Sequence, residues 1–144
     1  MSDLPAETTN GAPARGQRTI MREAHFPDRA PIDAYGNGGF RFAGMSHVGA
    51  IMCLPSGIYG WSATTAVEFK DLELFARPVA EGEALELLLL GTGSDLIPLP
   101  ATARNHLSEN DIRTEVMSTG AAIRTFNVLL AEGRRVGAAL LPVG

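Results

Sequence analysis

A segment near the C-terminus carries most of the polar groups that could do chemistry in this sequence. Residues 119–135 read TGAAIRTFNVLLAEGRR, so Arg124, Thr125 and Asn127 interrupt an apolar run that begins with small residues. At about 100° per residue, little of the circumference of such a helix is polar. We therefore expect other elements to cover the helix on more than one side, which would place Arg124 close to the core.

A guanidinium close to the core needs a partner, because burying the charge unpaired is costly. One candidate is internal, and the carboxylate of Asp95 is the obvious choice. The other is an anion or an acidic group on another protein. Gly120, Ala121 and Ala122 have side chains too small to screen the free N–H groups of a helix start, and such a start attracts negative charge. Both candidates stay open at the level of sequence.

A second loop supports a site at the same place. The segment GTGSD (91–95) follows an expected strand, and the helix start at 118–124 follows another. In parallel α/β sheets, ligands gather at the carboxyl ends of the strands. If the two strands are neighbours, the two segments face each other across one crevice. The candidate ligand-binding residues are then Gly91, Gly93, Asp95, Thr119, Gly120, Arg124 and Asn127.

Other chemical constellations are weak. The Gly-x-Ser-x-Gly motif of hydrolases is absent, and no nucleophile has a base beside it in the sequence. His25, His47 and His106 lie far apart, which does not resemble a metal site. Cys53 lies in an apolar run and is expected to be a small buried core residue. The carboxylates of the run EGEALE (81–86) are expected to be solvated. We assign no catalytic residue, no metal and no cofactor.

Composition narrows the class of protein. The chain has 144 residues and a net charge of −4 with scattered arginines, which argues against nucleic-acid binding. No run approaches the roughly 20 apolar residues that cross a bilayer, so we expect a cytoplasmic protein without a transmembrane segment. Residues 1–24 lack an apolar signal core, and we expect a flexible tail there. Residues 25–144 are expected to form a single α/β domain.

The N-terminal half of that domain has the pattern of an antiparallel β meander. A tight turn is expected at 37–39, where Asn-Gly-Gly tolerates positive φ. One strand is expected over 44–55 and the next over 58–61, with Trp61 as a packing residue. A short helix is expected at 70–76, ended by Pro78.

The C-terminal half alternates between strand and helix patterns. The expected order is strand, helix, strand, helix, strand over 84–91, 99–111, 112–118, 119–133 and 134–143. A β-α-β-α-β order favours a mainly parallel or mixed sheet layered with helices. The first of these strands is a continuous apolar run, as expected of a central strand that is covered on both faces, and the last is apolar almost throughout.

Several motifs together resemble one known family. These are NGGFRF, LPSGIYGW, LLLLGTG, PLPATARNHL and EVMSTGAAIRTFNVLLAEGRRVGAALLPV, which together span about residues 31–143. They resemble a family of small α/β proteins of unknown molecular activity, whose eukaryotic members include the mitochondrial NADH dehydrogenase complex assembly factor three. The resemblance implies a three-layer α/β domain with a mixed central sheet and an additional antiparallel β portion. For the mitochondrial members it also implies a role in building respiratory complex I beside a partner assembly factor.

The sequence departs from the family pattern at two positions of the same helix. Family members often have cysteine at the position of Ile123 and tyrosine at that of Phe126. Both differences remove polar groups, so a mechanism that needs a thiol or phenol there is in doubt for this chain. The positions that the resemblance carries over as a functional surface are Gly91, Gly93, Thr119, Gly120, Arg124 and Asn127.

Three functional hypotheses follow. In the first, the protein is a non-enzymatic assembly or interaction factor that binds another assembly factor or a respiratory-complex subunit, and it reaches the inner membrane only through that partner. In the second, it binds a small anionic ligand, or acts on one, in the crevice of 91–95 and 118–124. In the third, Arg124, Asn127 and Asp95 only hold the core together.

Overall fold

The computed structural model describes residues 26–144, so the tail expected at 1–24 lies outside the described part of the chain. The described strands form two sheets, one of five strands in the order β5-β4-β8-β6-β7 and one of three in the order β1-β2-β3. The strands are β1 (Ile32–Gly36), β2 (Gly39–Phe42), β3 (Met45–Val48), β4 (Ile51–Leu54), β5 (Gly57–Gly60), β6 (Leu87–Gly91), β7 (Thr114–Met117) and β8 (Val136–Leu140). The α-helices are α1 (Ala76–Ala80), α2 (Ala101–Glu109) and α3 (Thr119–Ala131), and the 3₁₀ helices are η1 (Ala66–Lys70), η2 (Leu72–Phe75) and η3 (Gly82–Ala84).

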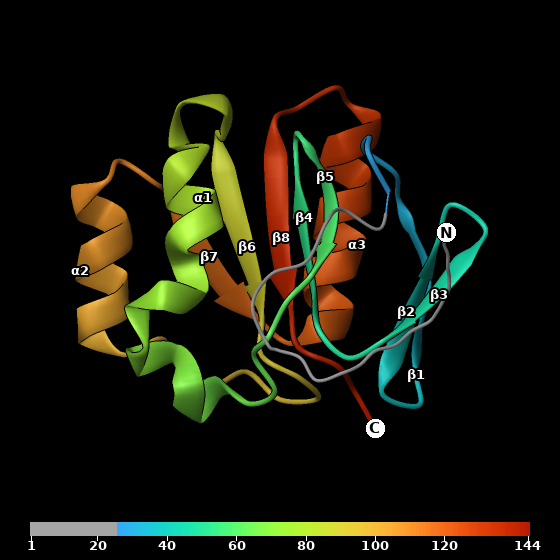
Figure 1. Ribbon diagram of the computed structural model, residues 1–144, viewed down its shortest axis with the longest axis horizontal. Helices are drawn as coiled ribbons and strands as arrows, with labels where there is room; N and C mark the ends of the chain where they lie inside the picture. The colour runs from blue at the N-terminus through green and yellow to red at the C-terminus, as the bar shows by residue number, and fades with distance from the viewer. Residues whose placement is uncertain (1–25) are drawn as a thin grey trace, which may run out of the picture.

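The five-stranded sheet separates two layers of helix. Helices α1 and α2 cover one face, and α3 covers the other, as Figure 1 shows. The three-stranded sheet lies beyond α3, which therefore packs between the two sheets. The fold is a three-layer α/β domain with an additional antiparallel β portion, as expected.

The large sheet is mixed, and its centre explains the apolar strands. Strand β6 pairs in parallel with both β7 and β8, while β4 pairs antiparallel with β8. Because β6 and β8 have a strand on each side and a helix layer over each face, they can hold apolar side chains throughout. Leu88, Leu89 and Leu90 are accordingly fully buried.

Each face of the large sheet has its own apolar core. Under α1 and α2, Trp61 stacks on Phe69 with ring centroids 5.7 Å apart and donates a hydrogen bond of 2.9 Å from Nε1 to the carbonyl of Leu74. Under α3, Phe126 joins the buried face of the three-stranded sheet. Cys53 is buried in that second core, and burial raises the pKa of its thiol. The packing roles expected for Trp61 and Cys53 are confirmed.

The strand expected over 44–55 is wrong, because the chain changes sheets inside it. Strand β3 ends at Val48 in the small sheet, and β4 begins at Ile51 in the large one. Gly49 stands between them with φ +97, a conformation that other residues rarely adopt. Periodicity alone could not show this turn, since apolar residues lie on both sides of it.

The helix expected at 70–76 is also misplaced. Helical structure runs from η1 through η2 into α1, and Pro78 is the third residue of α1 rather than a terminator. The N–H groups of a first helical turn have no acceptor within the helix, so a proline there loses no hydrogen bond. In this short helix, Pro78 is also buried.

The two hairpins of the small sheet give a matched test of turn chemistry. Asn37-Gly38 connects β1 to β2 and Ala43-Gly44 connects β2 to β3, all four residues having positive φ. Such turns favour Asn-Gly, and alanine is strained in this conformation. We expect Ala43→Asn to raise the free energy of unfolding by about 0.5–1 kcal/mol. Asn37→Ala should lower it by a similar amount. Urea denaturation measures both, and an unchanged midpoint for both variants would contradict the strain.

Candidate functional site

The two segments that the sequence singled out lie side by side at one edge of the large sheet. Strands β6 and β7 are parallel neighbours, with Gly91 opposite Met117 at their carboxyl ends. The segment after β6 and the start of α3 are joined directly. The amide of Thr119 donates to the carbonyl of Gly93 at 2.8 Å, and the amide of Gly93 donates to Thr119 Oγ1 at 2.9 Å.

Thr119 also ties this junction to the last strand. Its hydroxyl donates to the carbonyl of Leu141 at 2.7 Å, and the side chain is fully buried. Gly91 leaves room for this approach, because a Cβ on it would lie 2.9 Å from both Cα and Oγ1 of Thr119. The junction is therefore closely packed and hydrogen-bonded across β6, β8 and α3.

These hydrogen bonds engage several donors that an anion site would use. The Gly93 amide, the Thr119 amide and the Thr119 hydroxyl all bond within the fold. The side chain of Ser118 caps α3 and accepts from the amide of Ala121 at 3.4 Å. The start of α3 thus has internal acceptors for these groups. This weakens the argument that small side chains at the helix start leave N–H groups free to bind an anion.

Arg124 and Asp95 do not form the ion pair considered from the sequence. Both are exposed, and no ion pair joins them or links Arg124 to another carboxylate of residues 26–144. The expectation that Arg124 lies close to the core is wrong. The buried face of α3 is centred on Thr119, Ile123 and Phe126, and Arg124 points about 140° from Thr119 at the helical rotation per residue.

Asn127 has a structural role. Its Oδ1 accepts from the amide of Ile32 and its Nδ2 donates to the carbonyl of the same residue, both at 2.9 Å. The side-chain amide thus accepts from and donates to the backbone of one residue of β1, as the backbone of a paired strand does. These two hydrogen bonds link α3 to the small sheet. The part of the third hypothesis that concerns Asn127 agrees with this geometry, although the contact reaches β1 rather than Arg124 or Asp95.

Tyr35 is a residue of this surface that the sequence did not single out. Its hydroxyl lies over Gly120, where a Cβ would collide with it, and Arg124 Nη1 lies 3.6 Å from the same Cβ position. Tyr35 is 43% exposed on β1, and Val128 is 57% exposed one helical turn after Arg124. No spacing rule links position 35 to position 120, because the contact depends on how the two sheets pack against α3.

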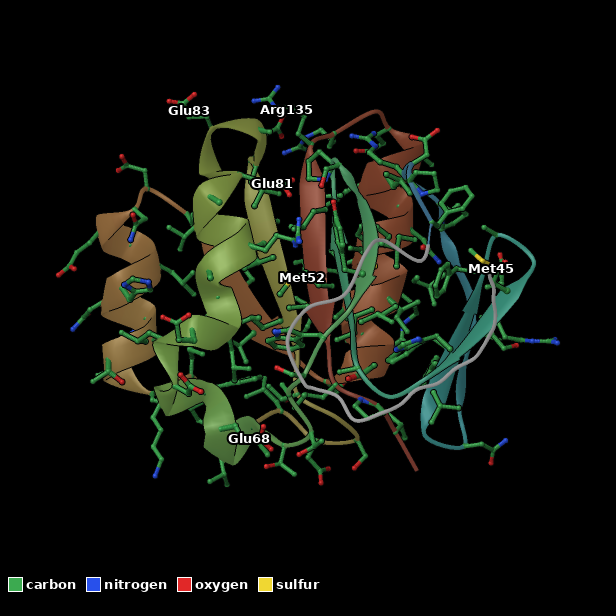
Figure 2. The ribbon with its side chains drawn as sticks, in the orientation of Figure 1. Met45, Met52, Glu68, Glu81, Glu83 and Arg135 are labelled. Carbon is green, nitrogen blue, oxygen red and sulfur yellow. The ribbon has the colours of Figure 1, made fainter. Side chains whose placement is uncertain are left out.

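The carboxylates of 81–86 do not form an acid–base pair. Glu83 is exposed as expected, whereas Glu81 and Glu86 are half-buried and make separate contacts. Glu81 accepts from Ser56 Oγ at 2.8 Å. Glu86 accepts from Arg134 at 2.7 Å, and this hydrogen bond holds the pKa of Glu86 below its ordinary value. Figure 2 shows Glu83 and Arg135 at one end of the domain and Glu68 at the other.

Other site types find little support in the part of the chain that is described. Within residues 26–144, no group of three or more His, Cys, Asp and Glu side chains could hold a metal ion. No helix there is long and apolar enough to cross a membrane.

Comparison with known proteins places the chain in a family. Residues 32–141 match the family described as "Protein of unknown function (DUF498/DUF598)". The chain belongs to this family. Among DUF498/DUF598 relatives, an uncharacterised protein of Rhodobacter capsulatus is 40% identical over 85% of this chain and 92% of its own length. The mouse protein named NADH dehydrogenase [ubiquinone] 1 alpha subcomplex assembly factor 3 is 30% identical over 87% of this chain and 67% of its own length.

The fold is shared with a solved structure. The crystal structure of a protein called an outer membrane protein, from Bartonella henselae, is 56% identical and aligns with a TM-score of 0.78. The alignment covers 83% of this chain and all of that one. The similar proteins therefore include one named as an assembly factor of NADH dehydrogenase and one called an outer membrane protein.

Removing the Thr119 hydroxyl tests how strongly the junction is fixed. Thr119→Val keeps the shape but leaves the carbonyl of Leu141 and the amide of Gly93 without their partner. We expect the free energy of unfolding to fall by about 2–4 kcal/mol. Thr119→Ser keeps the hydroxyl and should cost only about 1 kcal/mol. Urea denaturation distinguishes them, and equal losses would show that packing rather than hydrogen bonding fixes the junction.

Asn127 and Arg124 should differ sharply in their effect on stability. Asn127→Ala removes both hydrogen bonds to Ile32, and we expect a loss of about 2 kcal/mol. Arg124→Ala removes an exposed side chain and should stay within about 0.5 kcal/mol of the parent. Thermal and chemical unfolding of both variants provide the measurement. A large loss for Arg124→Ala would restore the hypothesis that this arginine holds the core together.

Proposed function

We propose that this chain is a non-enzymatic assembly or interaction factor that takes part in building a respiratory NADH dehydrogenase. The observation that carries the proposal is its similarity, over most of the described domain, to relatives that are named as assembly factors of that enzyme. The absence of a recognisable catalytic motif in the sequence is consistent with a binding role.

We place the partner contact on the exposed side of α3 and the neighbouring part of β1. Arg124 is exposed there without a carboxylate partner among residues 26–144, and Tyr35 and Val128 add exposed apolar surface nearby. Tyrosine and arginine are frequent in the energetically important part of protein interfaces. An acidic group on the partner, flanked by apolar side chains, would complement this surface.

The alternative, an anionic small molecule held between 91–95 and 118–124, draws less support. The amide of Gly93 and the hydroxyl of Thr119 would be its natural donors, and both bond within the fold. The exposed arginine is the remaining argument for it, and a partner carboxylate uses that arginine equally well.

Capture from cells tests the proposal. The tagged full chain, expressed in a strain that carries this gene and makes NADH dehydrogenase, should recover a subunit or another assembly protein of that enzyme. Arg124→Glu should abolish the capture while leaving the melting temperature unchanged, because the side chain is exposed. Arg113→Glu is the matched control, since Arg113 is also exposed but lies next to β7.

The outcome in cells completes the test. Deleting the gene should lower the amount of assembled NADH dehydrogenase, and the parent gene should restore it where Arg124→Glu does not. Normal enzyme levels in the deletion strain, together with no recovered subunit, would overturn the assembly role. Equal capture by the parent and by Arg124→Glu would instead move the contact to another surface.

A further inference from the structure

The outer face of the three-stranded sheet contains a hollow that the function proposed above does not use. Two rows of residues cross this face. Ala34, Arg41 and Ser46 are opposite one another in one row, and Gly36, Gly39 and Val48 in the next. All six line a hollow of about 300 Å³, near the lower end of the size range of small-molecule sites.

Glycine forms the floor of this hollow. A Cβ on Gly39 would collide with the carbonyl of His47, and Gly36 has a φ of +136, which other residues rarely adopt. Both glycines are therefore required by the backbone, and a flat area without side chains results between Arg41 and Val48. The neighbouring turn is held in place, since the Gly38 amide donates to the carbonyl of Val143 at 2.7 Å.

The walls of the hollow define the chemistry of a ligand. Val48 is 84% exposed, so a large hydrophobic side chain borders the hollow on the β3 side. Arg41 is exposed, and its Nε donates to Ser46 Oγ at 3.3 Å, while no carboxylate of residues 26–144 forms an ion pair with the guanidinium. No carboxylate lines the hollow, although the protein carries a net charge of −4.

From this arrangement we propose that the hollow binds a small aromatic monocarboxylate. The flat ring lies on the peptide planes of Gly36 and Gly39 against Val48, and the carboxylate pairs with the guanidinium of Arg41. Guanidinium groups bind carboxylates in a bidentate manner, which fixes the orientation of such a ligand. Because the hollow is on the outer face of the small sheet, this site is separate from the α3 contact of Arg124.

Titration of the full ¹⁵N-labelled chain with phenylacetate tests the site by NMR. We expect chemical-shift changes centred on the amides of Gly36, Gly39 and Val48. Acetate, which lacks the ring, and 2-phenylethanol, which lacks the charge, should bind much more weakly. Arg41→Gln should weaken phenylacetate binding by about tenfold, and Val48→Ser should also weaken it.

Matched variants keep the test specific. Arg113→Gln and Val67→Ser change an exposed arginine and an exposed valine elsewhere and should leave the affinity unchanged. The spectrum of each variant shows whether it is folded. The proposal is overturned if phenylacetate leaves the amides of the hollow unmoved, if acetate binds equally well, or if folded Arg41→Gln binds like the parent. Partner capture should survive Arg41→Gln, so the two proposals can fail separately.

Discussion

The arrangement of this domain depends on one buried threonine. Thr119 begins α3, and its backbone and side chain together join the segment after β6 to the end of β8 through hydrogen bonds to Gly93 and Leu141. Each of those groups would otherwise be a polar atom without a partner in a closely packed place, which is costly. The threonine thereby fixes the position at which α3 crosses the central strands, and the small sheet then packs against α3.

Small residues around the start of α3 allow β6 and β1 to pack closely against this helix. Gly91 cannot carry a side chain without meeting Thr119, and Gly120 leaves the space that the hydroxyl of Tyr35 occupies. The same pattern of small residues would suit an anion site, because it exposes backbone N–H groups. Whether such residues serve close packing or anion binding depends on the acceptors of the nearby donors. Here Gly93, Ser118 and Leu141 supply those acceptors from within the chain.

The sequence predicted the elements whose pattern is local and long, and it failed where the fold brings distant segments together. The continuous apolar run at 84–91 correctly indicated β6 as a central strand. The segments at 91–95 and 118–124 share one edge, as expected if their strands were neighbours, and β6 and β7 are neighbours. The change of sheet at Gly49 was missed because apolar residues, Val48 and Ala50, flank the glycine on both sides. The apolar helix was expected to be covered on more than one side, and α3 does pack between the two sheets, but Arg124 was misplaced because the side that carries Arg124 and Val128 stays exposed. Tyr35 was missed because its contact with Gly120 spans two layers.

The placement of polar groups separates the parts of this domain that can vary from those that cannot. At the carboxyl edge of the large sheet, backbone and hydroxyl groups are committed to one another, so replacing them would disturb the junction of three elements. Arg124, Val128 and Arg41 instead project from the surface, where substitutions usually change stability by less than about 0.5 kcal/mol. Such a scaffold can acquire or lose a partner by changing a few exposed side chains while its core stays the same. We therefore expect recognition in this family to reside on the exposed faces of α3 and of the small sheet rather than in the crevice at the strand ends.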